Sequence, residues 1–223
     1  MQHNDNNLPS PKLYVKTLGV YFDNNLSMDK HVSELTRVCY MHLNSLRSIG
    51  NMLTTELKIM LVNALILSRI DYCNSILFNC SEYCLSKLQK VLNSAVRFIY
   101  NLRHHTSTTA YLKKAHFLPV RYRIRYKIAL LTFKCINNFA PDYLKSCLQL
   151  MLPSNTYLRR NDDFYLLKKP ILVQNSLLSQ FKTFTYSAPC VWNTLPYSIR
   201  CLSSLSEFKS KLKTYLFRCA FPS

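Results

Sequence analysis

Asp162 and Asp163 form the one place in this sequence where two carboxylates are adjacent. Paired carboxylates are what a polymerase or nuclease uses to hold two metal ions. This pair has no apolar strand before it and no third carboxylate nearby in sequence, and Arg159 and Arg160 can neutralise its charge. We therefore predict a solvated loop at this position, and we expect no catalytic residues in the chain.

Cysteine and histidine could provide metal ligands or a nucleophile. The nine cysteines are scattered, and only Cys80 and Cys84 lie within four positions of each other. His104 and His105 follow without a second pair at ligand spacing, and no acid lies near them in sequence to orient a ring. We predict reduced, mostly buried thiols and a polar loop at the two histidines, with no metal site and no cofactor in this chain.

Positive charge is the dominant chemical feature of the chain. The sequence has 29 Lys and Arg against 11 Asp and Glu, a formal net charge of +18. Between Glu82 and Asp142 it has no acidic residue and eleven basic ones. A surface that serves only solubility mixes both signs, whereas a one-signed field attracts polyanions such as nucleic acid. The candidate nucleic-acid contacts are Lys87, Lys90, Arg97, Arg103, Lys113, Lys114, Arg123 and Lys127.

Helices are expected to carry most of these residues, because two glycines in 223 residues are too few for a turn-rich all-β chain. Apolar residues recur at spacings of three and four from position 30 to position 49, and Gly50 can end that helix. Thr54 or Thr55 can cap a second helix, and Ser81 can cap a third. A basic stripe follows one face of the third helix: Lys87, Lys90, Ser94 and Arg97.

The stretch from Val120 to Ile128 alternates apolar and basic residues, which would give a β-strand one cationic face. It continues as a long apolar segment to Cys135, too long for the alternation to persist. Pro119 also suits the first position of a helix. We predict a helix with two basic edges, one carrying Arg121 and Arg125 and the other carrying Arg123, Lys127 and Lys134.

The predicted fold is mainly α: a helical bundle with a short N-terminal β-strand or hairpin, and a smaller C-terminal α region containing irregular segments. We expect boundaries at 1–29, 30–152, 153–180 and 181–223, with 153–180 as an irregular hinge. Ser204 and Glu207 have the spacing of a capping box. The best apolar run is broken by Asn63, and the N-terminus has no apolar core of a signal peptide, so we expect an intracellular protein without a membrane span.

Several longer stretches carry a family resemblance through their order and spacing: KTLGVYFDNNLSMDKHV, SRIDYCNSILFN, LSKLQKVLNSAVRFIYN, HFLPVRYRIRYKI, APDYL, YSAPCVWNTLPYSIR and FKSKLKTYLF. Together they resemble the C-terminal region of the reverse transcriptases of non-LTR (LINE-type, jockey-like) retrotransposons. The resemblance covers residues 13 to 217.

The resemblance implies a thumb-like bundle and a C-terminal extension that lie along template and primer. It implies that Leu18, Gly19 and Val20 belong to a primer-grip-like hairpin, which would make 1–29 the end of a palm. The Phe/Tyr-x-Asp-Asp motif of that palm, which holds Mg²⁺, belongs before Leu18 and is not in this sequence. The expected partners are therefore RNA or an RNA–DNA hybrid and a separate palm-containing polymerase segment, with no membrane and no small-molecule substrate. No enzyme activity is expected of this chain alone.

Other interpretations remain open at the level of sequence. The chain could be a structural remnant of a decayed mobile element, with no ligand, because the Leu18 strand would lack its sheet. The basic faces could be solvated helix surfaces. Basic amphipathic helices can also lie on a membrane, but that requires a dominant exposed apolar face, whereas these apolar faces are expected to be used by the bundle.

Overall fold

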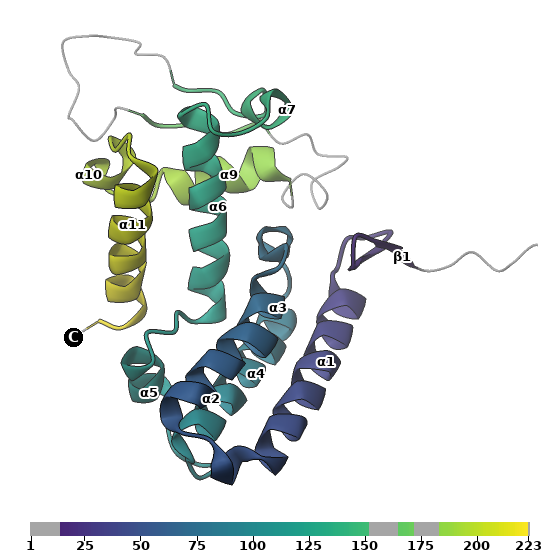
Figure 1. Cartoon of the computed structure of the whole chain (residues 1–223). Helices are drawn as coiled ribbons and strands as arrows, with labels where there is room; N and C mark the ends of the chain where they lie inside the picture. The colour runs from purple at the N-terminus through teal and green to yellow at the C-terminus, as the bar shows by residue number, and fades with distance from the viewer. Residues whose placement is uncertain (1–13, 152–164, 172–182, 223) are drawn as a thin grey trace, which may run out of the picture.

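The computed structural model describes residues 14–151, 165–171 and 183–222. They form a mainly helical protein with a two-stranded antiparallel hairpin at the N-terminal end, which confirms the predicted fold class (Figure 1). Strands β1 (Tyr14–Thr17) and β2 (Val20–Asp23) pair so that Thr17 lies opposite Val20. Leu18 and Gly19 are therefore the two residues of the turn, with φ of 48° and 82°. Positive φ at both positions is the geometry of a type I′ turn.

Three helical segments follow the hairpin on one side of the bundle. Helix α1 (Asp29–Ser48) lies within one residue of its expected bounds. A short 3₁₀ turn, η1 (Gly50–Met52), leads to α2 (Thr55–Val62), and the Thr54 hydroxyl accepts a hydrogen bond from the Leu57 amide, which confirms the expected cap. Helix α2 continues without a break through a π-helical turn, η2 (Asn63–Leu67), into α3 (Ser68–Asp71).

The middle of the chain forms the central helices of the bundle. A 3₁₀ turn, η3 (Asn74–Leu77), precedes α4 (Glu82–Tyr100), and the Ser81 hydroxyl caps α4 at the Cys84 amide as predicted. After α5 (Thr109–Lys114) comes α6 (Val120–Ile136), so the alternating stretch is a helix and not a strand. Pro119 is the N-cap residue of α6 rather than its first helical residue.

The C-terminal part contains α7 (Asp142–Lys145), α9 (Phe184–Trp192), α10 (Tyr197–Arg200) and α11 (Leu205–Ala220). The predicted capping box at the start of α11 is wrong. The Ser204 hydroxyl lies 3.0 Å from the Ser206 hydroxyl and makes no cap, and Glu207 pairs instead with Lys211 one turn later. The side chains have local partners that compete with the backbone for the same hydrogen bonds.

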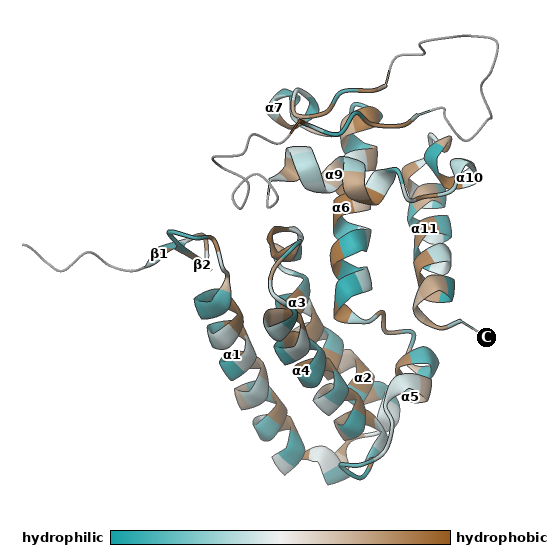
Figure 2. Cartoon of the chain, turned by 180° about the vertical axis from the view of Figure 1, so that it is seen from behind, coloured by the Kyte–Doolittle hydropathy of each residue, from teal (hydrophilic) through white to brown (hydrophobic). Residues whose placement is uncertain are grey.

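One hydrophobic core joins these helices. Helix α1 packs on α4, while α6 packs on both α9 and α11. The Phe133 and Phe208 rings stack with centroids 4.1 Å apart, and the Trp192 ring lies 5.8 Å from Phe208. Figure 2 shows hydrophobic residues where α9 crosses α6, in agreement with this packing.

The segment predicted as a hinge is described only at 165–171, and there it is bound to α9. The Trp192 indole donates to the Tyr165 carbonyl at 2.7 Å. The Asn193 side chain forms two bonds with the backbone of Leu167, accepting from the amide at 2.9 Å and donating to the carbonyl at 2.8 Å. The rest of 153–180, with Asp162 and Asp163, lies outside the described residues.

The cysteines of the described residues are all free thiols. All nine cysteines lie in the described residues, and no disulfide joins any two of them there. Burial raises the pKa of the Cys39 thiol to about 11. Within the described ranges, no helix combines the length and the apolarity needed to cross a membrane.

Candidate nucleic-acid interface

Two grooves open on either side of the helical run α2–η2–α3. The first, which we call the hairpin groove, separates this run from α1 and the β-hairpin, and it has a volume of about 700 Å³. The second, the α6 groove, separates the same run from α6 and α11 and has a volume of about 370 Å³. The hairpin groove is lined by Lys16, Leu18, Gly19, Tyr21, His31, Glu34, Leu35, Arg37, Val38, Ala64, Ser68, Arg69 and Tyr72. The α6 groove is lined by Asn63, Asp71, Ala115, His116, Phe117, Leu118, Arg123, Tyr126, Lys127 and Lys213.

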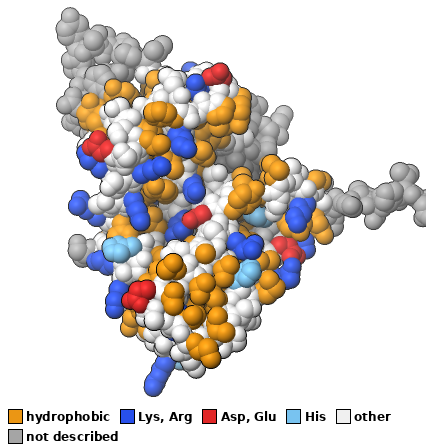
Figure 3. All heavy atoms as spheres, in the orientation of Figure 1, with side chains coloured by type: hydrophobic (Ala, Val, Ile, Leu, Met, Phe, Trp, Pro, Cys, Tyr) orange, Lys and Arg blue, Asp and Glu red, His pale blue; other side chains and the backbone are white. Residues whose placement is uncertain are grey.

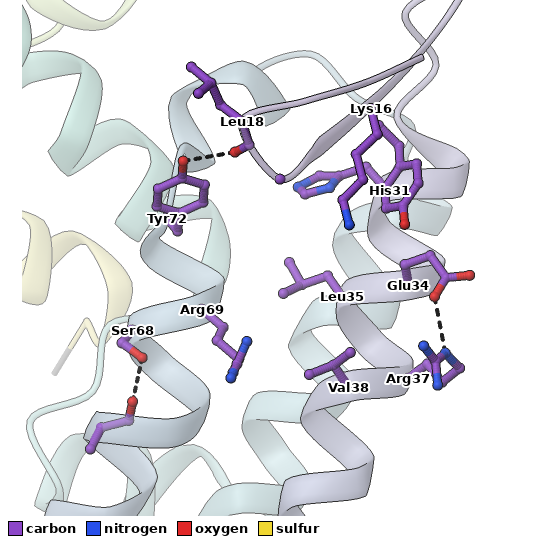
Figure 4. Close-up of a pocket in the computed structure, with 13 residues that line it drawn as sticks. Lys16, Leu18, His31, Glu34, Leu35, Arg37, Val38, Ser68, Arg69 and Tyr72 are labelled. Atoms are coloured by element: carbon purple, nitrogen blue, oxygen red, sulfur yellow. Dashed lines mark hydrogen bonds and ion pairs between the residues drawn. The ribbon is translucent and has the colours of Figure 1, made fainter. Parts of the chain in front are cut away.

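Within the described ranges, one side-chain hydrogen bond links the hairpin to the far wall of the hairpin groove. The Tyr72 hydroxyl, just after α3, donates to the Leu18 carbonyl in the turn at 2.9 Å (Figure 4). Leu18 itself is 84% exposed. A Cβ at Gly19 would lie 3.9 Å from the Tyr72 ring, an ordinary contact, so the positive φ and not crowding favours glycine there.

Charges in the hairpin groove are partly neutralised by one carboxylate. Glu34 accepts from Lys30 at 2.9 Å and from Arg37 at 3.0 Å, and these hydrogen bonds lower the pKa of its carboxyl. Figure 4 shows Lys16 and Arg69 reaching into the groove from opposite walls. Neither of these two side chains forms an ion pair with a described residue. Burial lowers the pKa of His31, which lies under the hairpin.

The α6 groove contains one carboxylate, and it is fully engaged. Arg123 of α6 binds Asp71 of α3 with two bonds, Nε to Oδ1 at 2.8 Å and a terminal nitrogen to Oδ2 at 2.5 Å. The Asn74 amide adds a longer bond to Oδ1 at 3.3 Å. Both side chains of the ion pair are mostly buried, with 16% and 27% exposure for Arg123 and Asp71. The pair therefore ties α3 to α6.

Two lysines in the α6 groove keep their charge uncompensated. Lys127 of α6 and Lys213 of α11 both line it, and neither forms an ion pair with a residue that the structure describes. His116 lies at the rim with its ring 5.5 Å from that of Phe217. Tyr126 adds a half-buried phenol whose pKa is raised by burial.

The predicted basic stripe of α4 is divided by its contacts. Lys87 donates to the Ser33 hydroxyl of α1 at 3.2 Å and lies 4.3 Å from the Tyr83 ring centroid. Lys90 is exposed. Arg97 donates to the Thr106 carbonyl at 3.4 Å, and its Nε is buried with no hydrogen-bond partner among the described residues. Lys90 is therefore the member of this stripe with the best access to a ligand.

The remaining predicted contacts lie in the loop after α4 and in the last turn of α5. Arg103, Lys113 and Lys114 are all exposed there. Lys114 lies 5.4 Å from the centroid of Tyr100, whose ring is 5.2 Å from that of Tyr111. His104 and His105 lie in the exposed loop between the two helices. We call Arg103, Lys113 and Lys114 the α5 corner.

Figure 3 shows Lys and Arg side chains spread over the face that carries both grooves, with few Asp and Glu among them. Of the residues predicted from sequence, Arg123 and Lys127 line the α6 groove, and Leu18 and Gly19 line the hairpin groove. Val20 is buried instead, at 3% exposure. The cationic residues Lys16, Arg69 and Lys213 also line these grooves, and they were not predicted because no local sequence pattern connects them to the grooves.

In the described part of the chain there is no group of three or more His, Cys, Asp or Glu side chains placed to hold a metal ion. Comparisons with protein-family models, with curated proteins and with solved structures found no match to this chain.

Proposed function

We propose that this chain binds RNA or an RNA–DNA hybrid with little sequence preference, as the thumb and C-terminal extension of a non-LTR-type reverse transcriptase. It would hold template and primer through basic helices. A separate palm-containing segment would supply the carboxylates and the Mg²⁺ for phosphoryl transfer, so the chain alone would not polymerise DNA.

The observation that carries this proposal is the one-signed charge of residues 83–141, which have eleven basic residues and no acid. Lys90 and the α5 corner are exposed and form no ion pair within the described residues. Exposed cations on this scale gain affinity for a phosphate backbone by releasing its counterions. The Tyr100 and Tyr111 rings beside Lys114 offer surfaces on which unpaired bases can stack.

The hairpin turn supports a contact with the primer end. Leu18 combines a left-handed backbone, at φ 48°, with 84% exposure. A branched side chain in that conformation is strained, and strain of this kind concentrates at binding and switching sites. An exposed leucine at a turn tip, next to Lys16 in the groove, could pack on a sugar while the lysine approaches a phosphate.

The test uses Lys90→Glu, Lys113→Glu and Lys114→Glu in one variant, since these side chains are exposed and none is needed for the core. Fluorescence anisotropy with a labelled RNA–DNA hybrid over a salt series measures affinity. We expect the wild-type affinity to fall steeply with salt, and the variant to bind at least about tenfold more weakly with a shallower salt dependence. Arg97 is left unchanged because its reversal would disturb the Thr106 contact.

A control variant, Arg47→Glu, Lys168→Glu and Lys169→Glu, makes the same change in net charge at exposed positions outside the acid-free segment and outside the C-terminal helices. It should bind closer to wild type. Equal losses in both variants would mean that net charge alone attracts the nucleic acid, and binding that ignores salt would count against the proposal altogether.

A further inference from the structure

We propose that the α6 groove is a site for a phosphate monoester of nucleotide size, whose phosphate is held by the ammonium groups of Lys127 and Lys213. This site is distinct from the surface formed by Lys90 and the α5 corner. It would bind its ligand whether or not that surface binds nucleic acid.

The size and the walls of the groove suit a small ligand. Its volume of about 370 Å³ lies within the range of roughly 300–1,000 Å³ that is common for ligand pockets. Helices form its walls, and the Asp71–Arg123 pair fixes two of them relative to each other. A site built on packed helices is already organised before the ligand arrives, which reduces the entropic cost of binding.

The balance of charge selects an anion. Asp71 is the one carboxylate among the lining residues, and both of its oxygens are bound by Arg123. Lys127 and Lys213 then face the groove without a described acidic partner. A phosphate monoester carries close to two negative charges near neutral pH and several acceptor oxygens, so it can bond both ammonium groups at once.

The polar and aromatic neighbours favour a nucleotide over inorganic phosphate. Asn63 lines the groove from the π-helical turn, an irregularity of helices that occurs frequently at functional sites. Its amide can donate to a phosphate or accept from a sugar hydroxyl. The half-buried Tyr126 and the exposed His116 line the same groove and provide ring surfaces for a nucleoside.

The test is calorimetric titration of the full chain with adenosine monophosphate, adenosine and inorganic phosphate, repeated with Lys127→Ala and Lys213→Ala. We expect the monophosphate to bind more tightly than either fragment, and each substitution to weaken it by at least about tenfold through loss of a charge-assisted bond. Lys211→Ala is the matched control on α11, because Lys211 pairs with Glu207 and does not line the groove. Thermal melting of each variant shows that it is folded.

A 5′-phosphorylated oligonucleotide, compared with its 5′-hydroxyl form, identifies the source of the phosphate. Binding of either phosphorylated ligand that depends on both lysines supports the site. The ligand that binds more tightly shows whether the phosphate belongs to a free nucleotide or to the end of an oligonucleotide. The proposal is overturned when no phosphate ligand binds, when adenosine binds as tightly as its monophosphate, or when Lys211→Ala weakens binding equally. Lys113 and Lys114 directly precede the groove residues Ala115 and His116, so their reversal changes the field at the groove but removes no phosphate contact. The Lys90, Lys113 and Lys114 reversal should therefore weaken monophosphate binding less than Lys127→Ala or Lys213→Ala does, which separates this site from the proposed nucleic-acid surface.

Discussion

The hairpin groove and the α6 groove share the helical run α2–η2–α3 as a common wall, yet their outer walls are held in different ways. A bidentate ion pair between mostly buried side chains ties α6 to α3. Among the described residues, one side-chain hydrogen bond, from Tyr72 to Leu18, joins the hairpin to the end of α3, and all four residues of β1 are exposed. Helix α1 packs on α4 and strand β2 packs on α1, so the exposed part of this wall is β1 and the turn. The α6 groove should therefore keep its width, while the hairpin groove should be able to change its width at the end formed by β1 and the turn.

This difference matches the ligands proposed for the two grooves. A small anion needs a preformed pocket, whereas a polymer that passes through a groove benefits from a wall that yields. The same helical run can serve both, because the side chains at 64, 68 and 72 face one groove and those at 63 and 71 face the other.

The largest expected effect is on the fixed wall. Asp71→Asn leaves Arg123 with its charge uncompensated in a mostly buried place, and we expect a loss of about 2 kcal/mol in the free energy of unfolding. Glu82→Gln is the control, because the Arg121–Glu82 pair is exposed at 54% and 74% and should cost under about 0.5 kcal/mol. Urea denaturation measures both, and equal costs would mean that the Asp71 pair is not what fixes this wall.

A smaller, local effect is expected at the yielding wall. Tyr72→Phe removes the hydrogen bond to Leu18 and should weaken the hairpin contact by about 1 kcal/mol, which speeds amide exchange in residues 14–23 roughly fivefold. Amide exchange in α6 should stay as in wild type. Tyr83→Phe on α4 is the matched control. Faster exchange throughout the chain would show that the hairpin is instead part of the cooperative unit.

The smallest effect expected is a pH dependence that belongs to the hairpin groove. Burial lowers the pKa of His31 from its ordinary value of 6.5. As the pH falls below about 6.5, the unfolded chain takes up a proton that the folded chain resists, so stability is lost until the folded pKa is passed. Urea midpoints at pH 7.5 and 5.5 should show this loss in wild type. A smaller loss in His31→Gln is expected, and an identical loss would assign the dependence to other groups.

The local parts of this fold could be predicted from sequence. Helix periodicity located α1, and the length of the apolar segment after Pro119 located α6. The hydroxyl caps at Thr54 and Ser81 fix the starts of α2 and α4, because a cap depends on residues a few positions apart. The prediction of a capping box at Ser204 was wrong, because other side chains at similarly short sequence distances compete for the same groups. Ser204 contacts the Ser206 hydroxyl, and Glu207 pairs with Lys211.

The grooves could not be predicted, because they depend on contacts between distant segments. Asp71 and Arg123 are 52 residues apart, and Tyr72 and Leu18 are 54 apart. Lys213 reaches the α6 groove only because α11 packs on α6. The π-helical turn at Asn63–Leu67 also could not be recognised from the spacing of apolar residues in the sequence. Charge composition indicated that a basic surface exists, but only the packing of helices determined which cations are left without partners.

Trp192, whose indole donates a hydrogen bond to the Tyr165 carbonyl, can serve as an intrinsic fluorescent probe. Trp192 is the sole tryptophan of the sequence, and its side chain is fully buried beside Phe208. Its fluorescence should be blue-shifted in the folded protein and should move to longer wavelength only when α6, α9 and α11 come apart. Emission from this one residue, without any label, can therefore time the release of the C-terminal helices separately from the fraying of the hairpin.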